Sequence, residues 1–160
     1  QRLEGLDLKD LLRKDFIQIK DDKLTWKEAI RMASQPLLDH QYINEEYVDA
    51  MIVKVEELGP YIVLAPRVAV PHARPEEGAK KLGISLLKLN HSVDFDFKGE
   101  AKKEVNLIFV LSTVDSSSHL RALQQLANLL DDEENIEQMI KIDQIDELYT
   151  FIEERGELDD

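Results

Sequence analysis

The sequence contains no cysteine, and this removes several kinds of chemistry at once. Disulfide bonds, thiolate nucleophiles and zinc sites built on thiolates are all excluded. No apolar run approaches the ~18 residues that a membrane-spanning helix needs. The first twenty residues carry too many charges for a signal peptide. These absences predict a cytoplasmic protein that does not insert into a membrane.

Basic residues are also scarce, because 20 Lys and Arg stand against 33 Asp and Glu, for a net charge of −13. Nucleic acids and anionic membrane surfaces both require clustered positive charge, so neither is expected as a ligand. A strongly acidic surface favours a basic protein partner, whose approach it would steer electrostatically. The simpler alternative is that the charge only keeps the chain in solution.

The chain also lacks internal repeats, low-complexity tracts and any long linker, so residues 1–160 are expected to form a single domain with an acidic tail from about 156. Hydrophobic periodicity predicts helices at 3–12, 26–38 and 45–58 and near 120–130, 136–140 and 145–152, and strands at 16–20, 61–64, 68–70, 83–89 and 105–111. The segment 105–111 is almost continuously apolar, which is typical of a central strand buried on both faces. The predicted fold is therefore a three-layer α/β/α arrangement, with a central mixed sheet of about five strands flanked by helices.

A stiff loop around His72 is the most informative stretch of the chain. Pro71 and Pro75 fix their own backbone and push Val70 and Arg74, the residues before them, toward extended geometry. The imidazole is therefore held on a non-helical loop at the mouth of a strand, which suits chemistry better than packing.

His119 has a matching setting, because it follows the strand 105–111 through a polar loop and lies at the start of a helix. Ligands bind at strand ends in sheets that are covered on both faces, so His72 and His119 are expected to converge. The alternative is that one or both are merely solvent-facing, as is expected of His40 and His91.

Several reactions compete for these histidines. A metal site would lack the His-x-x-x-His or His-x-Glu spacing, and a serine hydrolase would lack the Gly-x-Ser-x-Gly elbow around residues 116–118. Gly78 and Gly83 do not form a phosphate-binding glycine loop. A neutral imidazole that accepts a phosphoryl group covalently is favoured, with stabilisation from His119, free N–H groups at its helix start and Arg74. No metal or cofactor is expected.

These residues resemble a known family. The segments VAVPHARPE (68–76) and SHLRAL (118–123) are similar to the enzyme IIA components of the mannitol/fructose class, in the phosphoenolpyruvate-dependent sugar phosphotransferase system. The resemblance runs from about 24 to 154. The form of residues 71–78, preceded by GPYIV (59–63), looks most like the ascorbate branch. Relatives tend to carry an arginine near the end of the preceding helix, where this chain reads KVEE (54–57), and Arg74 is the candidate to stand in.

The resemblance implies a two-step phosphoryl relay. His72 would accept the group from the phosphohistidine of the carrier HPr and pass it to a cysteine of a IIB component. The IIC membrane permease would take part only indirectly. His119 would hydrogen-bond the phosphoryl group, and the face around His72 would be partly apolar so that two partners could bind in turn. The alternative is a regulatory domain of this kind, excised from a transcriptional regulator and controlled by phosphorylation.

Overall fold

A computed structural model describes residues 6–96, 99 and 102–157. Its centre is a five-stranded mixed sheet, as the sequence predicted. The strands lie in the order β1 (Ile17–Lys20), β4 (Gly83–Asp94), β5 (Glu104–Ser112), β3 (Arg67–Ala69) and β2 (Val63–Ala65). The pairs β1–β4 and β3–β5 are parallel, and the pairs β4–β5 and β2–β3 are antiparallel. β5 is the middle strand, and every residue after Glu104 in it is buried.

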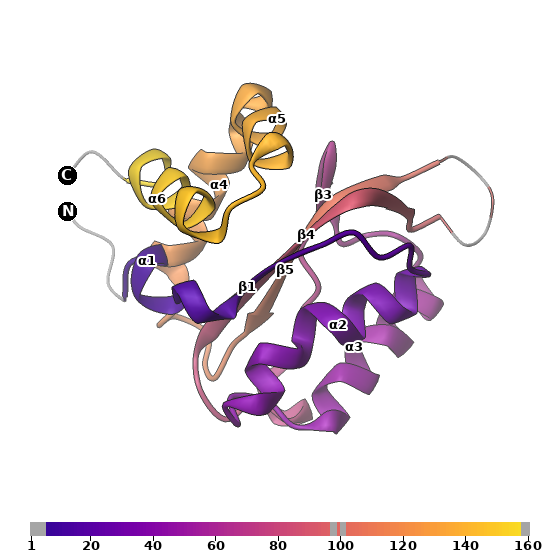
Figure 1. Cartoon of the computed structure of the whole chain (residues 1–160). Coiled ribbons are helices and arrows are strands. Elements are labelled where there is room, and N and C mark those ends of the chain that lie inside the picture. The colour runs from indigo at the N-terminus through magenta and orange to yellow at the C-terminus, as the bar shows by residue number, and fades with distance from the viewer. Residues whose placement is uncertain (1–5, 97–98, 100–101, 158–160) are drawn as a thin grey trace.

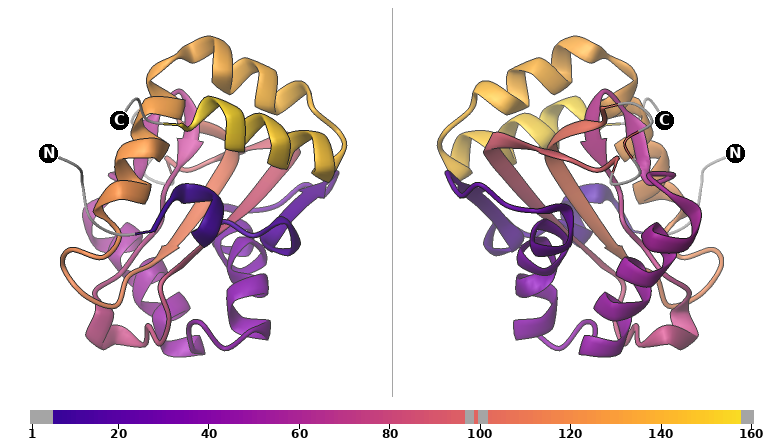
Figure 2. Two further views of the ribbon diagram at one scale, coloured as in Figure 1. Left: turned by 90° about the vertical axis from the view of Figure 1, so that its left-hand side faces the viewer. Right: turned by 90° about the vertical axis from the view of Figure 1, so that its right-hand side faces the viewer.

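Helices cover both faces of this sheet, which confirms the predicted three layers (Figure 1). One face carries α2 (Trp26–Asp39) and α3 (Glu45–Leu58), whereas α4 (Leu120–Asp131), α5 (Glu133–Lys141) and α6 (Ile145–Arg155) lie on the other, beside the short α1 (Leu8–Leu11). Figure 2 shows the same two layers from both sides. In the described part of the chain, no helix has the length and apolarity needed to cross a membrane.

The helix starts follow local chemistry. The side chain of Thr25 accepts a hydrogen bond from the backbone N–H of Glu28, and the Glu28 carboxylate accepts one from the Thr25 N–H, so the two residues form a capping box at the start of α2. Asn44 caps α3 by accepting from the N–H of Tyr47. That cap fixes the register of α3, and thereby places Tyr47 on its buried face.

Some boundaries differ from those predicted. The first helix spans only Leu8–Leu11 within the described residues, and the expected residues 3–5 lie outside them. β4 runs to Asp94, past the predicted end at 89, because the sheet continues through three exposed residues before Val93 resumes pairing with Val105. The last three residues of the predicted acidic tail also lie outside the described part.

The buried face of α4 is a further difference. Of the inner stripe that the sequence predicts, Leu120, Leu123, Leu126, Ala127 and Leu130, the middle leucine Leu126 is buried and Leu123 and Leu130 are partly buried, as predicted. Leu120 and Ala127 are exposed instead, and the helix also buries Ala122, Gln125 and Leu129. Leu120 is 46% exposed. The helix carries leucine on two sides, and the side chain of Gln125 is drawn inward because its Oε1 accepts a hydrogen bond from the backbone N–H of Leu8.

Candidate functional site

Both candidate histidines follow neighbouring parallel strands. His72 comes three residues after the end of β3 and pairs with Leu111 of β5 as an isolated parallel bridge. His119 follows the end of β5 through the loop 113–118 and occupies the N-cap position of α4. Because β3 and β5 are parallel, their carboxyl ends meet at one edge of the sheet. Both residues thus follow strands that end at the same edge of the sheet, and the convergence of their side chains stays a prediction.

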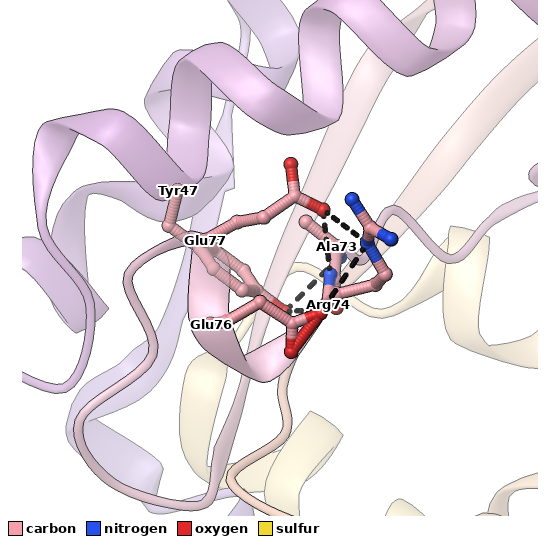
Figure 3. Close-up of polar contacts among 5 residues, drawn as sticks. All are labelled: Tyr47, Ala73, Arg74, Glu76 and Glu77. Atoms are coloured by element: carbon pink, nitrogen blue, oxygen red, sulfur yellow. Dashed lines mark hydrogen bonds and ion pairs between the residues drawn. The ribbon is translucent and has the colours of Figure 1, made fainter.

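The backbone on each side of His72 is tied to β5. The backbone N–H of Leu111 donates to the carbonyl of Pro71 at 3.1 Å. The hydroxyl of Tyr47 donates to the carbonyl of Leu111 at 2.7 Å and accepts from the N–H of Ala73 at 3.1 Å. Tyr47 is fully buried, and burial raises its pKa, so the hydroxyl stays protonated. Figure 3 shows its ring reaching from α3 to Ala73.

We expect Tyr47→Phe to lower the free energy of unfolding by about 1–3 kcal/mol, because the buried N–H of Ala73 would lose its acceptor. Urea denaturation measures the difference. Tyr149→Phe is the matched control, since that hydroxyl lies 3.5 Å from the Lys9 carbonyl at an exposed position, and its stability should change by less than about 0.5 kcal/mol. Equal stability of the two variants would contradict a clamping role for Tyr47.

The imidazole of His72 is held in one tautomer. Its Nδ1 lies 2.9 Å from the backbone carbonyl oxygen of Val70. A carbonyl can only accept, so Nδ1 carries the proton and Nε2 keeps its lone pair. The side chain is half-buried, so Nε2 is presented from an otherwise fixed ring. This arrangement suits nucleophilic attack by Nε2.

An aromatic residue stands beside this imidazole, and a cationic residue lies against that aromatic ring. The rings of Tyr61 and His72 meet edge to face, with centroids 6.2 Å apart. The ammonium nitrogen of Lys54, on α3, lies 5.6 Å from the centroid of the Tyr61 ring. Burial, followed by the charge of Glu77, raises the pKa of Tyr61 to about 12. The sequence had not singled out Tyr61 or Lys54.

The loop before His119 is ordered by one carboxylate. Asp115 accepts hydrogen bonds from the backbone N–H groups of Ser117 and Ser118 and from the Ser118 hydroxyl, at 2.9, 2.7 and 2.8 Å. These bonds, led by the Ser118 N–H, lower the pKa of Asp115. The serines thus serve the turn that delivers His119. Its Nδ1 is buried and has no hydrogen-bond partner among the described residues.

Arg74 faces acidic neighbours. Its Nε lies 3.2 Å from Glu77 and 3.5 Å from Glu76, and its side chain is 72% exposed (Figure 3). The backbone N–H of Arg74 also donates to Glu77, and these bonds lower the pKa of that carboxyl group. The guanidinium is therefore engaged by the 3₁₀ turn Pro75–Glu77 that follows it.

This combination of fold and site can be set against known proteins. The family model for the phosphoenolpyruvate-dependent sugar phosphotransferase system, EIIA 2, matches residues 10–155. The chain belongs to this EIIA family. It is therefore a phosphotransferase of the sugar phosphotransferase system, as the resemblance implied.

Two curated relatives of this EIIA chain come from Escherichia coli K12. A mannitol-specific cryptic phosphotransferase enzyme IIA component is 41% identical over 133 residues, covering 83% of this chain and 88% of that protein. An ascorbate-specific EIIA component is 33% identical over 136 residues, covering 84% and 87%. Relatives named for two different sugars thus match most of the chain.

Solved EIIA structures have the same fold. The solution structure of the mannitol-specific cryptic enzyme IIA from Escherichia coli gives a TM-score of 0.83 at 37% identity, covering 93% of this chain and 99% of that chain. A complex of the Escherichia coli mannitol enzyme IIA with phosphorylated enzyme IIB gives 0.75 at 27% identity, covering 91% and 100%.

The arginine that EIIA relatives tend to carry near this site has no direct counterpart in this chain. The arginine expected near the end of the preceding helix falls on α3, and this EIIA has Lys54 in that region, over the ring of Tyr61. Arg74, the candidate from the sequence, lies with Glu76 and Glu77. Within the described ranges, no group of three or more His, Asp or Glu side chains is arranged to hold a metal ion.

Proposed function

We propose that this EIIA accepts a phosphoryl group on Nε2 of His72 from the phosphohistidine of HPr and passes it to a cysteine of a IIB component. The observation that carries the proposal is the bond between His72 Nδ1 and the Val70 carbonyl, which leaves Nε2 as the nucleophile. These 160 residues contain no cysteine, so the acceptor thiol lies outside them.

Both transfers can be written as simple exchanges at phosphorus. In the first, the lone pair of His72 Nε2 forms an N–P bond while the P–N bond of the donor breaks and its electrons stay on the donor nitrogen. In the second, a thiolate of IIB forms an S–P bond and the electrons of the broken N–P bond return to Nε2. The proton stays on Nδ1, hydrogen-bonded to the Val70 carbonyl, through both steps. His72 therefore needs no separate base to remove a proton.

His119 is proposed to stabilise the phosphoryl group in flight. Its buried Nδ1 has no acceptor within the described residues, so the proton of a neutral ring is better placed on Nε2, where it can be donated. A loosely bonded phosphoryl group gains most from such fixed donors, because its charge is spread over three oxygens. The turn around Asp115 fixes the chain that delivers this donor.

Lys54 is proposed as the cation of the site, in place of Arg74. We expect Lys54→Met to slow phosphoryl acceptance roughly 10- to 100-fold, the effect of losing one hydrogen bond to a charged group. Arg74→Met should change the rate by less than about threefold, because that guanidinium pairs with two carboxylates at an exposed position. Rapid-quench measurement of phosphorylation by HPr compares the two variants, and the reverse order would restore Arg74 to the role predicted from the sequence.

Partner docking is supported by apolar surface beside the two histidines. Leu64, Val70, Leu123 and Leu130 help to line a hollow of about 240 Å³ between β2 and α4. Leu64 is 62% exposed and Leu120, next to His119, is 46% exposed. An apolar patch on a chain with a net charge of −13 suits transient binding of a basic carrier.

The proposal is tested by incubating the protein with phosphoenolpyruvate, enzyme I and HPr, which should give an acid-labile phosphoprotein. Adding a IIB component should then remove the label. Wild-type protein that never acquires label would overturn the proposal. Label that no IIB component can remove would favour the regulatory alternative.

A cytoplasmic location and a single domain over residues 1–160 are parts of the same proposal. Ascorbate stays a prediction for the transported sugar, resting on the form of residues 71–78. The identity to a mannitol-type relative is 41% and to an ascorbate-type relative 33%, so IIB components for both sugars belong in the assay.

A further inference from the structure

Two buried side-chain polar atoms in the described part of the chain have no hydrogen-bond partner, and both belong to this site. One is Nδ1 of His119 and the other is the hydroxyl oxygen of Tyr61. Buried polar groups are nearly always paired, so each exception calls for a physical explanation. The Tyr61 hydroxyl has no part in either transfer step described above.

The position of Tyr61 suggests what its hydroxyl is for. Its ring contacts the imidazole of His72 edge to face, so a group added to that imidazole would stand next to the phenol. The charge of Glu77, in the turn that follows His72 in the chain, contributes to the raised pKa of this hydroxyl after the larger effect of burial. The unpaired donor thus belongs to the residue whose ring contacts the imidazole that is to be phosphorylated.

We propose that the Tyr61 hydroxyl donates a hydrogen bond to an oxygen of the phosphoryl group carried by His72. The proposal rests on the proposed function, and it adds a phosphoryl-binding residue to that site. The donor is unpaired in the unphosphorylated protein and gains its acceptor only when the N–P bond has formed.

The chemistry of both groups fits such a bond. A phosphoryl group on nitrogen offers negatively charged oxygens that only accept. The Tyr61 hydroxyl is a pure donor toward it at neutral pH, because its raised pKa keeps the phenol protonated. Lys54 on the face of the same ring adds positive charge nearby. A neutral donor and a cation thus reach the phosphoryl group from the same pair of stacked side chains.

This arrangement predicts opposite effects of Tyr61→Phe on the two states of the protein. The unphosphorylated variant should melt about 2–6 °C higher than wild type, because an unpaired buried hydroxyl is removed. The phosphorylated variant should lose a charge-assisted hydrogen bond, so the equilibrium between phosphorylated HPr and phosphorylated EIIA should shift roughly 10- to 100-fold toward HPr.

The experiment compares wild type, Tyr61→Phe and the control Tyr149→Phe. The melting temperature is measured before and after phosphorylation. The ratio of phosphorylated EIIA to phosphorylated HPr is measured at equilibrium. Tyr61→Phe should raise the melting temperature of the unphosphorylated form and reduce the gain on phosphorylation, whereas Tyr149→Phe should match wild type in both states. A merely structural tyrosine would shift both states in the same direction, and that result would overturn the proposal.

Failure of the proposed function would look different. If HPr does not phosphorylate even the wild type, the small phosphoryl donor phosphoramidate can load the imidazole directly. Comparing melting temperatures then tests Tyr61 without HPr. The proposal is overturned if phosphorylation raises the melting temperature of Tyr61→Phe by as much as that of wild type. If Tyr61→Phe does not fold, the protein can instead carry 3-fluorotyrosine at position 61. Its ¹⁹F chemical shift should change on phosphorylation, and an unchanged shift overturns the proposal.

Discussion

His72→Gln should show no acid-labile phosphorylation when it is incubated with phosphoenolpyruvate, enzyme I and HPr. Glutamine can still donate an amide N–H toward the Val70 carbonyl, which lies 2.9 Å from Nδ1 of His72. It has no ring nitrogen with a free lone pair, so the covalent N–P bond cannot form. The loss should therefore be complete, and incorporation of labelled phosphate into the protein band measures it.

The matched control is His91→Gln, because His91 is exposed on β4, away from the carboxyl ends of β3 and β5. It should take up label at the wild-type rate. Both variants should keep cooperative unfolding transitions, since Tyr47 and Leu111 hold the loop through backbone atoms that the substitution leaves in place. Label on His72→Gln at the wild-type level would mean that the nucleophile lies elsewhere.

The local stiffness of the His72 loop could be predicted from the sequence, because proline acts through its own ring and on its immediate neighbour. The capping of α2 and α3 was predictable for the same reason, since the bonds of Thr25 and Asn44 span three residues. The central strand β5 also followed from its apolar run. All of these features are set by short-range chemistry.

The placement of the two histidines after strands could be expected from the sequence, but the common edge on which those strands end is a property of the sheet. It depends on the parallel pairing of β3 with β5, which joins residues about 39 positions apart, such as Val68 and Leu107. Strand order is decided by packing of the whole sheet, and no local signal encodes it. From the sequence, a common sheet edge for both residues is therefore only a hypothesis, and the parallel pairing of β3 with β5 supplies that edge.

Tyr47 and Tyr61 could not be recognised from the sequence. Tyr47 lies on the apolar face of α3 and resembles any core residue, yet its hydroxyl bonds to Ala73 and Leu111, 26 and 64 positions away. Arg74 shows the opposite case, because Glu76 and Glu77 follow it closely in the sequence. That spacing could have indicated that its charge is already paired.

His119→Ala should retain phosphorylation on His72 but slow it roughly 10²- to 10³-fold, the size typical of losing one preorganised transition-state donor. The imidazole is delivered by the turn around Asp115 and lies at the N-cap of α4, so its donor is held in place before the partner arrives. Rapid-quench kinetics with phosphorylated HPr measures the rate. The final level of label should approach that of the wild type, because the nucleophile is intact.

His119→Gln separates hydrogen bonding from packing. Its side-chain amide can donate to a phosphoryl oxygen, so it should recover part of the rate that His119→Ala loses, whereas a residue needed only for packing would not be rescued through its N–H group. His91→Ala should react like wild type in the same assay. A wild-type rate in His119→Ala would leave His119 only as the N-cap residue of α4 and assign the stabilisation of the phosphoryl group to Tyr61, whose ring contacts His72, and to Lys54, which lies over that ring.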